Sequence, residues 1–184
     1  MIDAPEAHYS FGTRQFLKRE AARLLRADDD DAAARPNATS SNPRLVIAEG
    51  RASDATYARE LSSARFCLCL PGYYAFTPRT VEAPNAGCVP ANVSPAGADP
   101  RHLKKIHLPF ERTLDWSSFS LFLDQRVLMT PGGLQAALLN VEHRRWRGMV
   151  EALDAVRLRL IWEAHGGSAW ATLLEELSRN ETRR

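Results

Sequence analysis

Short apolar runs alternate with segments of helical periodicity through the first half of the chain. Residues 45–48 and 66–70 are almost wholly apolar and predict buried strands, and a third apolar run follows Gly87. Between the first two runs, residues 54–63 have the spacing of an amphipathic helix, with Tyr57 and Leu61 facing inward. Because parallel strands need crossover connections, this alternation favours a parallel sheet covered by helices. The pattern predicts an α/β domain of the Rossmann-like class.

The helix expected between the second and third apolar runs has recognisable ends. Thr77 is suited to accept a hydrogen bond as N-cap, and Pro78 to occupy the first helical position, where its missing N–H costs nothing. Gly87 is a typical residue for ending a helix. Pro84 conflicts with the pattern, because an interior proline removes one hydrogen bond and costs about 3 kcal/mol or more. We expect either a kink after Ala83 or a damaged copy of this segment.

Two charged side chains fall in the first turns of this helix. Open α/β sheets usually bind anions and nucleotides where a helix starts at the carboxyl end of a parallel strand, and Arg79 adds a positive charge there. Glu82 lies three residues further along and projects from the same side of the helix. Both are candidates for contacts with a nucleotide. The alternative is a surface ion pair worth about 0.3 to 0.5 kcal/mol.

The remaining segments before residue 108 predict no metal site. Residues 9–26 have one apolar helical face, and residues 27–43 form an acidic low-complexity loop. A run of four consecutive aspartates, as this loop contains, is usually solvated. Residues 94–107 form a loop with Pro and Gly, in which His102 and His107 lack the Cys or carboxylate spacing of a metal site.

The second half of the chain changes from mixed to helical periodicity. Residues 108–110 look like a helix entry, and Trp116 with residues 119–123 predicts a last short strand. From residue 132 to residue 180 the apolar positions recur at three and four, with a pause at Gly166-Gly167. We therefore expect a domain over residues 9–130 and a helical segment over residues 132–180.

Composition excludes several classes of protein. The 24 Lys and Arg residues against 22 Asp and Glu give a net charge of +2, which is too balanced for a nucleic-acid or membrane-surface protein. The chain has no run of about 18 apolar residues, and its N-terminus lacks the apolar core of a signal peptide. Cys67 and Cys88 occupy equivalent early positions on successive strands, so a bridge between them competes with the alternative of three buried thiols, Cys69 included.

Twelve residues between positions 63 and 90 resemble the pattern of a known family. They are Ser63, Phe66, Cys67, Pro71, Gly72, Arg79, Glu82, Ala83, Gly87, Cys88, Val89 and Pro90. Downstream, residues 108–111 and 114–117 resemble the family's second signature, and residues 9–15 are a weaker upstream match. Together these segments resemble the nucleotide-sugar-binding half of the exostosin-type glycosyltransferases.

The resemblance implies a fold and an activity. The fold would be one half of a two-domain (GT-B type) transferase, with C-terminal helices that pack across the cleft to the other half. The activity would be transfer of a sugar, with inversion, from a nucleoside diphosphate sugar, most often a UDP-sugar, to a glycan acceptor. No built-in cofactor is implied. The family is typically anchored in the Golgi, so we expect a location in the Golgi lumen or membrane and a missing N-terminal domain or partner transferase.

The resemblance also implies roles for individual residues. Arg14 and Arg79 would approach the diphosphate, with an ordinary solvated arginine in a first turn as the alternative for Arg14. Glu82 would hold the ribose hydroxyls, and Gly72 with Tyr73 would hold the base. It further implies the Cys67–Cys88 disulfide. No catalytic residue is assigned, although Glu111 and Asp115 are candidates for a general base. The alternative hypotheses are a noncatalytic remnant or partner subunit that supports another transferase, and a small independent α/β domain.

Overall fold

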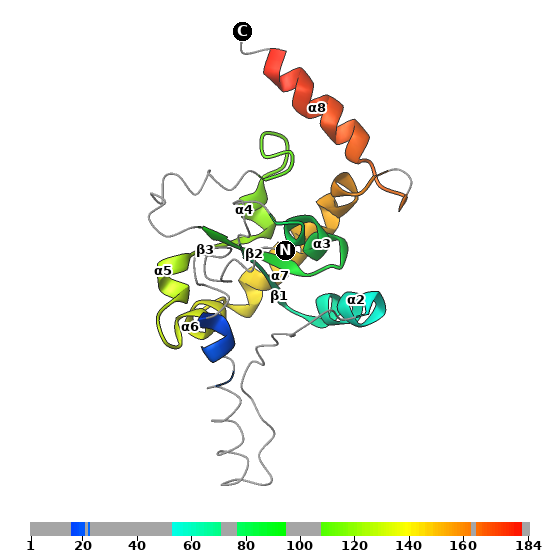
Figure 1. The fold of residues 1–184 in the computed structure, drawn as a ribbon. Helices are drawn as coiled ribbons and strands as arrows, with labels where there is room; N and C mark the ends of the chain where they lie inside the picture. Colours follow the sequence, from blue (N-terminus) through cyan, green and yellow to red (C-terminus); the bar gives the residue numbers. More distant parts are fainter. Residues whose placement is uncertain are drawn as a thin grey trace, which may run out of the picture.

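A parallel three-stranded sheet lies at the centre of the computed structural model, which describes residues 16–20, 22, 53–70, 77–94, 108–162 and 165–181 (Figure 1). The strands, in the sheet order β1-β2-β3, are β1 (Phe66–Cys69), β2 (Val89–Ser94) and β3 (Leu121–Asp124). Both strand pairs are parallel. The predicted α/β class with a parallel sheet is confirmed, whereas the strand predicted at residues 45–48 lies outside the described residues.

Helices surround this sheet and fill most of the C-terminal half. They are α2 (Asp54–Ser63), α3 (Arg79–Asn85), α4 (Trp116–Phe119), α5 (Gln125–Leu128), α6 (Gly133–Leu139), α7 (His143–Val156), the 3-10 helix η3 (Arg157–Leu160) and α8 (Ala169–Glu181). Residues 16–20 are also helical. The helix predicted over residues 54–63 therefore forms with the expected bounds, and Ser53 caps its first turn by accepting a hydrogen bond from the backbone N–H of Thr56.

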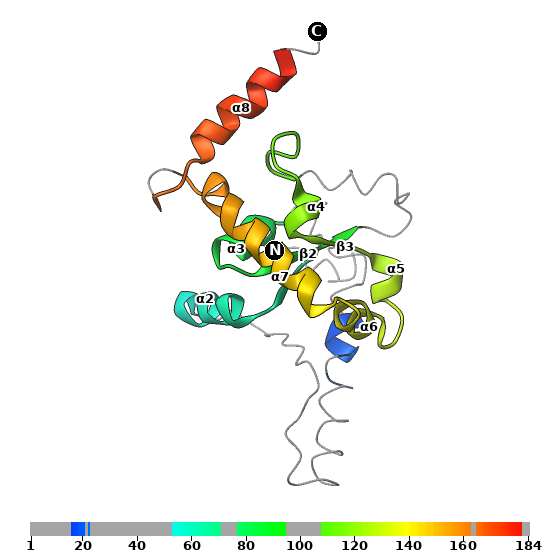
Figure 2. The ribbon, with the colours of Figure 1, turned by 180° about the vertical axis from the view of Figure 1, so that it is seen from behind.

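The two faces of the sheet are covered by different helices. Alternate residues of β1 point to opposite faces, so Cys67 and Cys69 pack with Leu61 of α2 and Ala83 of α3. The other face packs against α7 through Met149, with Val89, Ala91 and Leu121 from the sheet. Figures 1 and 2 show α3 and α7 on opposite sides of the strands. The order is helix, sheet, helix, as expected for a Rossmann-like half-domain.

The segment between β2 and β3 differs from its prediction. Residues 108–110 do not open a helix, because Phe110 has φ 54° and its carbonyl instead accepts turn hydrogen bonds from the N–H groups of Thr113 and Leu114. The helix α4 begins only after Asp115, whose carboxylate caps the N–H of Ser117 at 3.1 Å. Trp116 is therefore helical, and the last strand begins at Leu121 rather than at residue 119.

The C-terminal helix extends away from the sheet in both views (Figures 1 and 2). Its carboxylate Glu176 accepts hydrogen bonds from Thr113 and from the backbone of Arg112, which fix one side of the helix. Its apolar side chains are half exposed: Trp170, Leu174 and Leu177. No helix in the described ranges is long and apolar enough to cross a membrane.

Candidate functional site

The start of α3 differs from the prediction by one residue and in its chemistry. Pro78 is the N-cap and already has helical torsions (φ −53°, ψ −29°), and no side chain caps the helix. Thr77 contributes its carbonyl, which accepts a hydrogen bond from the N–H of Thr80 at 3.0 Å, so the predicted hydroxyl cap is wrong. The fixed φ of proline preorganises the first turn instead. At seven residues α3 is short, so Arg79 and Glu82 matter more here than the helix dipole.

The end of α3 follows the prediction and accommodates the interior proline. Gly87 has φ 78°, the N–H of Cys88 bonds to the carbonyl of Ala83 at 2.9 Å, and the N–H of Gly87 bonds to that of Pro84 at 3.0 Å. These two bonds make a Schellman motif. Pro84 is buried and lies one residue before the end of the helix, which continues past it to Asn85.

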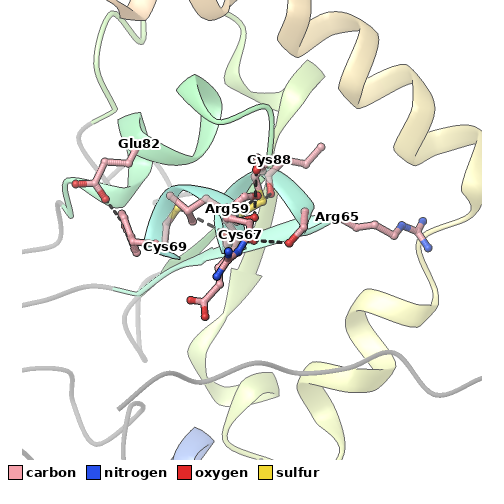
Figure 3. The surroundings of a disulfide bond; sticks show 12 residues. Arg59, Arg65, Cys67, Cys69, Glu82 and Cys88 are labelled. Carbon is pink, nitrogen blue, oxygen red and sulfur yellow. Dashed lines mark hydrogen bonds between the residues drawn. A yellow bond between two sulfur atoms is a disulfide. The ribbon is translucent and has the colours of Figure 1, made fainter. Parts of the chain in front are cut away.

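The Schellman motif places Cys88 next to Cys67 of β1. The structure joins Cys67 and Cys88 by a disulfide with a Cα–Cα distance of 5.9 Å (Figure 3). The bond ties the start of β1 to the residue before β2 and therefore holds α3 against the sheet. Cys69 is the free thiol, buried on the same face. Burial raises the pKa of its thiol to about 12, although the nearby Arg79 guanidinium acts in the opposite direction.

Arg79 and Glu82 both project from α3 but do not pair with each other. Among the ion pairs of the described residues, none joins these two side chains. Instead, the guanidinium of Arg79 lies 5.2 Å from the centre of the Tyr57 ring, and the Tyr57 hydroxyl donates a hydrogen bond to the Glu82 carboxylate. The surface ion pair that was the alternative for these residues is therefore absent.

Buried polar atoms without hydrogen-bond partners occur in α3 and in the strand next to β1. In the described part of the chain, both amide atoms of Asn92 have no hydrogen-bond partner. The Thr80 hydroxyl also has no partner of hydrogen-bond geometry, although it lies beside the Cys69 thiol, and each of the two side chains is about 1% exposed. Thr80 follows Arg79 in α3, and Asn92 pairs in register with Cys69. A buried polar group left unpaired costs about 1 to 3 kcal/mol. The fold keeps that cost at the carboxyl end of β1, where nucleotide sites of parallel sheets lie.

Only some of the other predicted site residues lie in the described part of the chain. Arg14, Gly72 and Tyr73 lie outside the described residues, so the structure brings together only Arg79 and Glu82 of the predicted donor contacts. Of the two candidate bases, Asp115 accepts hydrogen bonds from the backbone and the hydroxyl of Ser117, which makes it a helix cap, and Glu111 is exposed in a turn. Within the described ranges, no group of three or more His, Cys, Asp or Glu side chains is arranged to hold a metal ion.

Comparison with known proteins decides the family. A model of the exostosin GT47 domain matches residues 17–138, more than half of the chain. The chain belongs to the exostosin GT47 family. The matched segment of this exostosin-family chain includes all three strands, the disulfide, Arg79 and Glu82, together with α2, which contains Tyr57.

Curated relatives are named as glycosyltransferases. A probable glycosyltransferase of Arabidopsis thaliana is 24% identical over 117 residues, which are 64% of this chain and 22% of the relative. From the same plant, a probable β-1,4-xylosyltransferase is 32% identical over a segment that covers 39% of this chain and 15% of the relative. A probable glucuronoxylan glucuronosyltransferase of that plant is 35% identical over 39% of this chain and 14% of the relative. The family and these names support a glycosyltransferase by resemblance. The chain spans less than a quarter of each of these relatives.

Sequence reasoning missed the contacts of Tyr57 with Arg79 and Glu82. It assigned this residue to the buried face of its helix because of its spacing from Leu61, and Tyr57 does pack partly against the cluster around the disulfide. Spacing along α2 contains no information on the separation between α2 and α3, so the contact of the hydroxyl with Glu82 had no signal in the sequence. The buried, unpaired atoms of Asn92 and Thr80 had none either.

Proposed function

We propose that this chain is the donor-binding half of a two-domain exostosin-family glycosyltransferase, which transfers a sugar from a nucleoside diphosphate sugar, most often a UDP-sugar, to a glycan acceptor. In this account Arg79 binds the diphosphate and Glu82 binds the ribose hydroxyls. The observation that supports it best is the joint contact of Arg79 and Glu82 with Tyr57 in the first turns of α3, the helix that follows the carboxyl end of β1.

The chemistry of such a transfer explains what these residues would do. The leaving group is a diphosphate, whose developing negative charge an arginine stabilises through charge-assisted hydrogen bonds. A carboxylate suits the ribose hydroxyls because it accepts from both of them. No residue of the described site is assigned to deprotonate the acceptor hydroxyl. We propose that this step belongs to the other half of the enzyme, supplied by a preceding domain or a partner transferase.

The disulfide supports a location in an oxidising compartment. Disulfides persist in the oxidising compartments of the secretory pathway and are rare in reducing compartments such as the cytosol. The Cys67–Cys88 bridge therefore agrees with a site of action in the Golgi lumen. Arg14, Gly72 and Tyr73 remain proposed donor contacts, the first to the diphosphate and the other two to the base.

Calorimetric titration with UDP tests the proposal. We expect saturable binding by the oxidised chain, weakened about 10- to 100-fold in Arg79→Ala, because a charge-assisted hydrogen bond contributes about 1.5 to 3 kcal/mol. Glu82→Ala should weaken binding to a similar extent. Arg145→Ala is the matched control, because it removes one exposed arginine from α7, on the other face of the sheet. Equal loss in the control would indicate nonspecific attraction of the anion.

The same titration separates the main alternative. A folded chain that binds no UDP would contradict the donor-site proposal and would favour the noncatalytic partner. Circular dichroism and a cooperative unfolding transition must accompany that result, so that a failure of folding is not taken for a failure of binding.

A further inference from the structure

Among the described residues, Tyr57 contacts both charged members of the proposed donor site. Its ring lies 5.2 Å from the Arg79 guanidinium, and its hydroxyl donates to Oε2 of Glu82. It reaches them from α2, which is separate from the helix that holds Arg79 and Glu82. Its side chain is half-buried, while that of Glu82 is exposed.

We propose that Tyr57 is a positioning residue of the donor site, holding the Glu82 carboxylate through its hydroxyl and the Arg79 guanidinium over its ring. The proposal rests on the proposed function, because it assigns Tyr57 a task in the same site. Tyr57 itself does not contact the nucleotide: it acts through the two side chains that do. Its hydroxyl engages one carboxylate oxygen of Glu82 and leaves Oε1 available to a ligand.

The physical reason is the freedom of long charged side chains. Arginine and glutamate lose much rotamer freedom when they bind a ligand, and this loss weakens binding unless the free protein has already restricted them. An aromatic ring that attracts the guanidinium and a phenol that bonds the carboxylate provide such a restriction. Because the partner of each is the same residue, their relative placement is also fixed.

The support beneath Tyr57 is itself rigid. The Ser53 cap fixes the start of α2, and Leu61 is buried against Cys67, Cys69 and Ala83. The disulfide then ties this cluster to the end of α3. A continuous set of packed residues thus leads from the core to Tyr57, and from Tyr57 to Arg79 and Glu82.

Two substitutions separate positioning from mere packing. Tyr57→Phe keeps the ring over Arg79 and removes the bond to Glu82, whereas Tyr57→Leu removes both. By calorimetry we expect UDP to bind Tyr57→Phe about fivefold more weakly than the wild type, the equivalent of one hydrogen bond of about 1 kcal/mol. Tyr57→Leu should lose about tenfold or more, because the cation–π contact is lost as well. Arg59→Gln, an exposed substitution on the same helix, is the control and should bind normally.

A purely structural clip between α2 and α3 would give a different result. In that case Tyr57→Phe would lower the unfolding midpoint and leave the UDP affinity within twofold of wild type, at temperatures where both proteins are folded. That outcome would overturn the proposal. Loss of affinity in Tyr57→Phe without a matching loss of stability supports it.

Titration of Tyr57 provides a readout that needs no nucleotide. Burial and the hydrogen bond to Glu82 raise the pKa of Tyr57 above its ordinary value of 10.0, and the Arg79 charge lowers it. The thiol of Cys69 is a further titratable group near Arg79 and Glu82. Glu82→Gln should therefore lower the pKa of Tyr57, and Arg79→Ala should raise it. Tyrosine ring carbon NMR measures it, with Tyr57→Phe assigning the signal among four tyrosines.

The two measurements fail independently. If Glu82→Gln leaves the pKa of Tyr57 unchanged, the contact between Tyr57 and Glu82 is wrong, whether or not the chain binds UDP. Absence of UDP binding by the wild type, with the pKa responses intact, would contradict the proposed function and with it the task assigned to Tyr57. Both responses together support the positioning role.

Discussion

Replacing Cys67 and Cys88 together by alanine should remove the constraint that the disulfide places on the unfolded chain. The bridge closes a loop between residues separated by 21 positions. For a loop of this length the chain-entropy relation predicts a stabilisation of about 3.3 kcal/mol at 25 °C. The loop contains α3 and the proposed donor residues, so the predicted loss falls on the part of the fold that presents Arg79 and Glu82.

The control is Cys69→Ala. Cys69 lies two residues from Cys67 on the same face and is buried to the same degree, but it forms no bridge. Its truncation should cost only the lost packing, about 1 kcal/mol. The difference between the double variant and this control therefore contains the effect of the bond together with the packing loss of one further buried sulfur.

Urea unfolding followed by circular dichroism is the assay, run with and without dithiothreitol. Without reductant, the double variant should be less stable than Cys69→Ala by about 2 kcal/mol or more, with a larger m-value because its unfolded chain is less compact. Reductant should bring the wild type and Cys69→Ala down by about 3 kcal/mol and leave the double variant unchanged. Equal midpoints for the double variant and Cys69→Ala in oxidising buffer, with no effect of reductant on the wild type, would refute this reasoning.

Three other substitutions or modifications test separate features. Burial raises the pKa of Cys69 to about 12, so iodoacetamide at pH 8 should label no thiol of the oxidised native chain. One thiol should react after the chain is unfolded, and all three should react after it is both unfolded and reduced. Labelling of three thiols without reduction would show that the bridge is absent. Gly87→Ala should cost about 1 kcal/mol of unfolding free energy, because Gly87 has φ 78° while its surroundings leave room for a Cβ. Thr80→Val should raise the unfolding midpoint, since it removes an unpaired buried hydroxyl that costs about 1 kcal/mol or more; a lower midpoint would show that Thr80 makes a stabilising bond.

The regular parts of the fold could be predicted because local signals agreed there. Residues 54–63 had helical spacing with Tyr57 and Leu61 on one face, and the helix has those bounds. The runs at residues 66–70 and after Gly87 were apolar and separated by a crossover, and they form parallel neighbours. The long helical pattern after residue 132 also forms helices, with breaks at Asn140 and around Gly166.

The differences arose where backbone geometry overrode side-chain preference. Thr77 is a good cap by residue type, but the helical torsions of Pro78 move the cap position by one residue and leave the hydroxyl unused. Phe110 adopts a left-handed conformation that a bulky residue rarely takes, so residue type predicted a helix entry where a turn forms. Of the site, the sequence indicated Arg79 and Glu82, but their common contact with Tyr57 depends on how α2 and α3 pack.

Mapping of UDP onto the folded chain by NMR tests the central claim most directly. Titration of ¹⁵N-labelled, oxidised protein with UDP should shift the amide signals of residues 79–82 and of Cys69 at the end of β1, and the side-chain amide of Asn92 should shift with them. The signals of α7, on the opposite face, should stay in place. Shifts confined to the exposed arginines of α7, or no shifts at saturating UDP, would contradict the assignment of a donor site to this half of the fold.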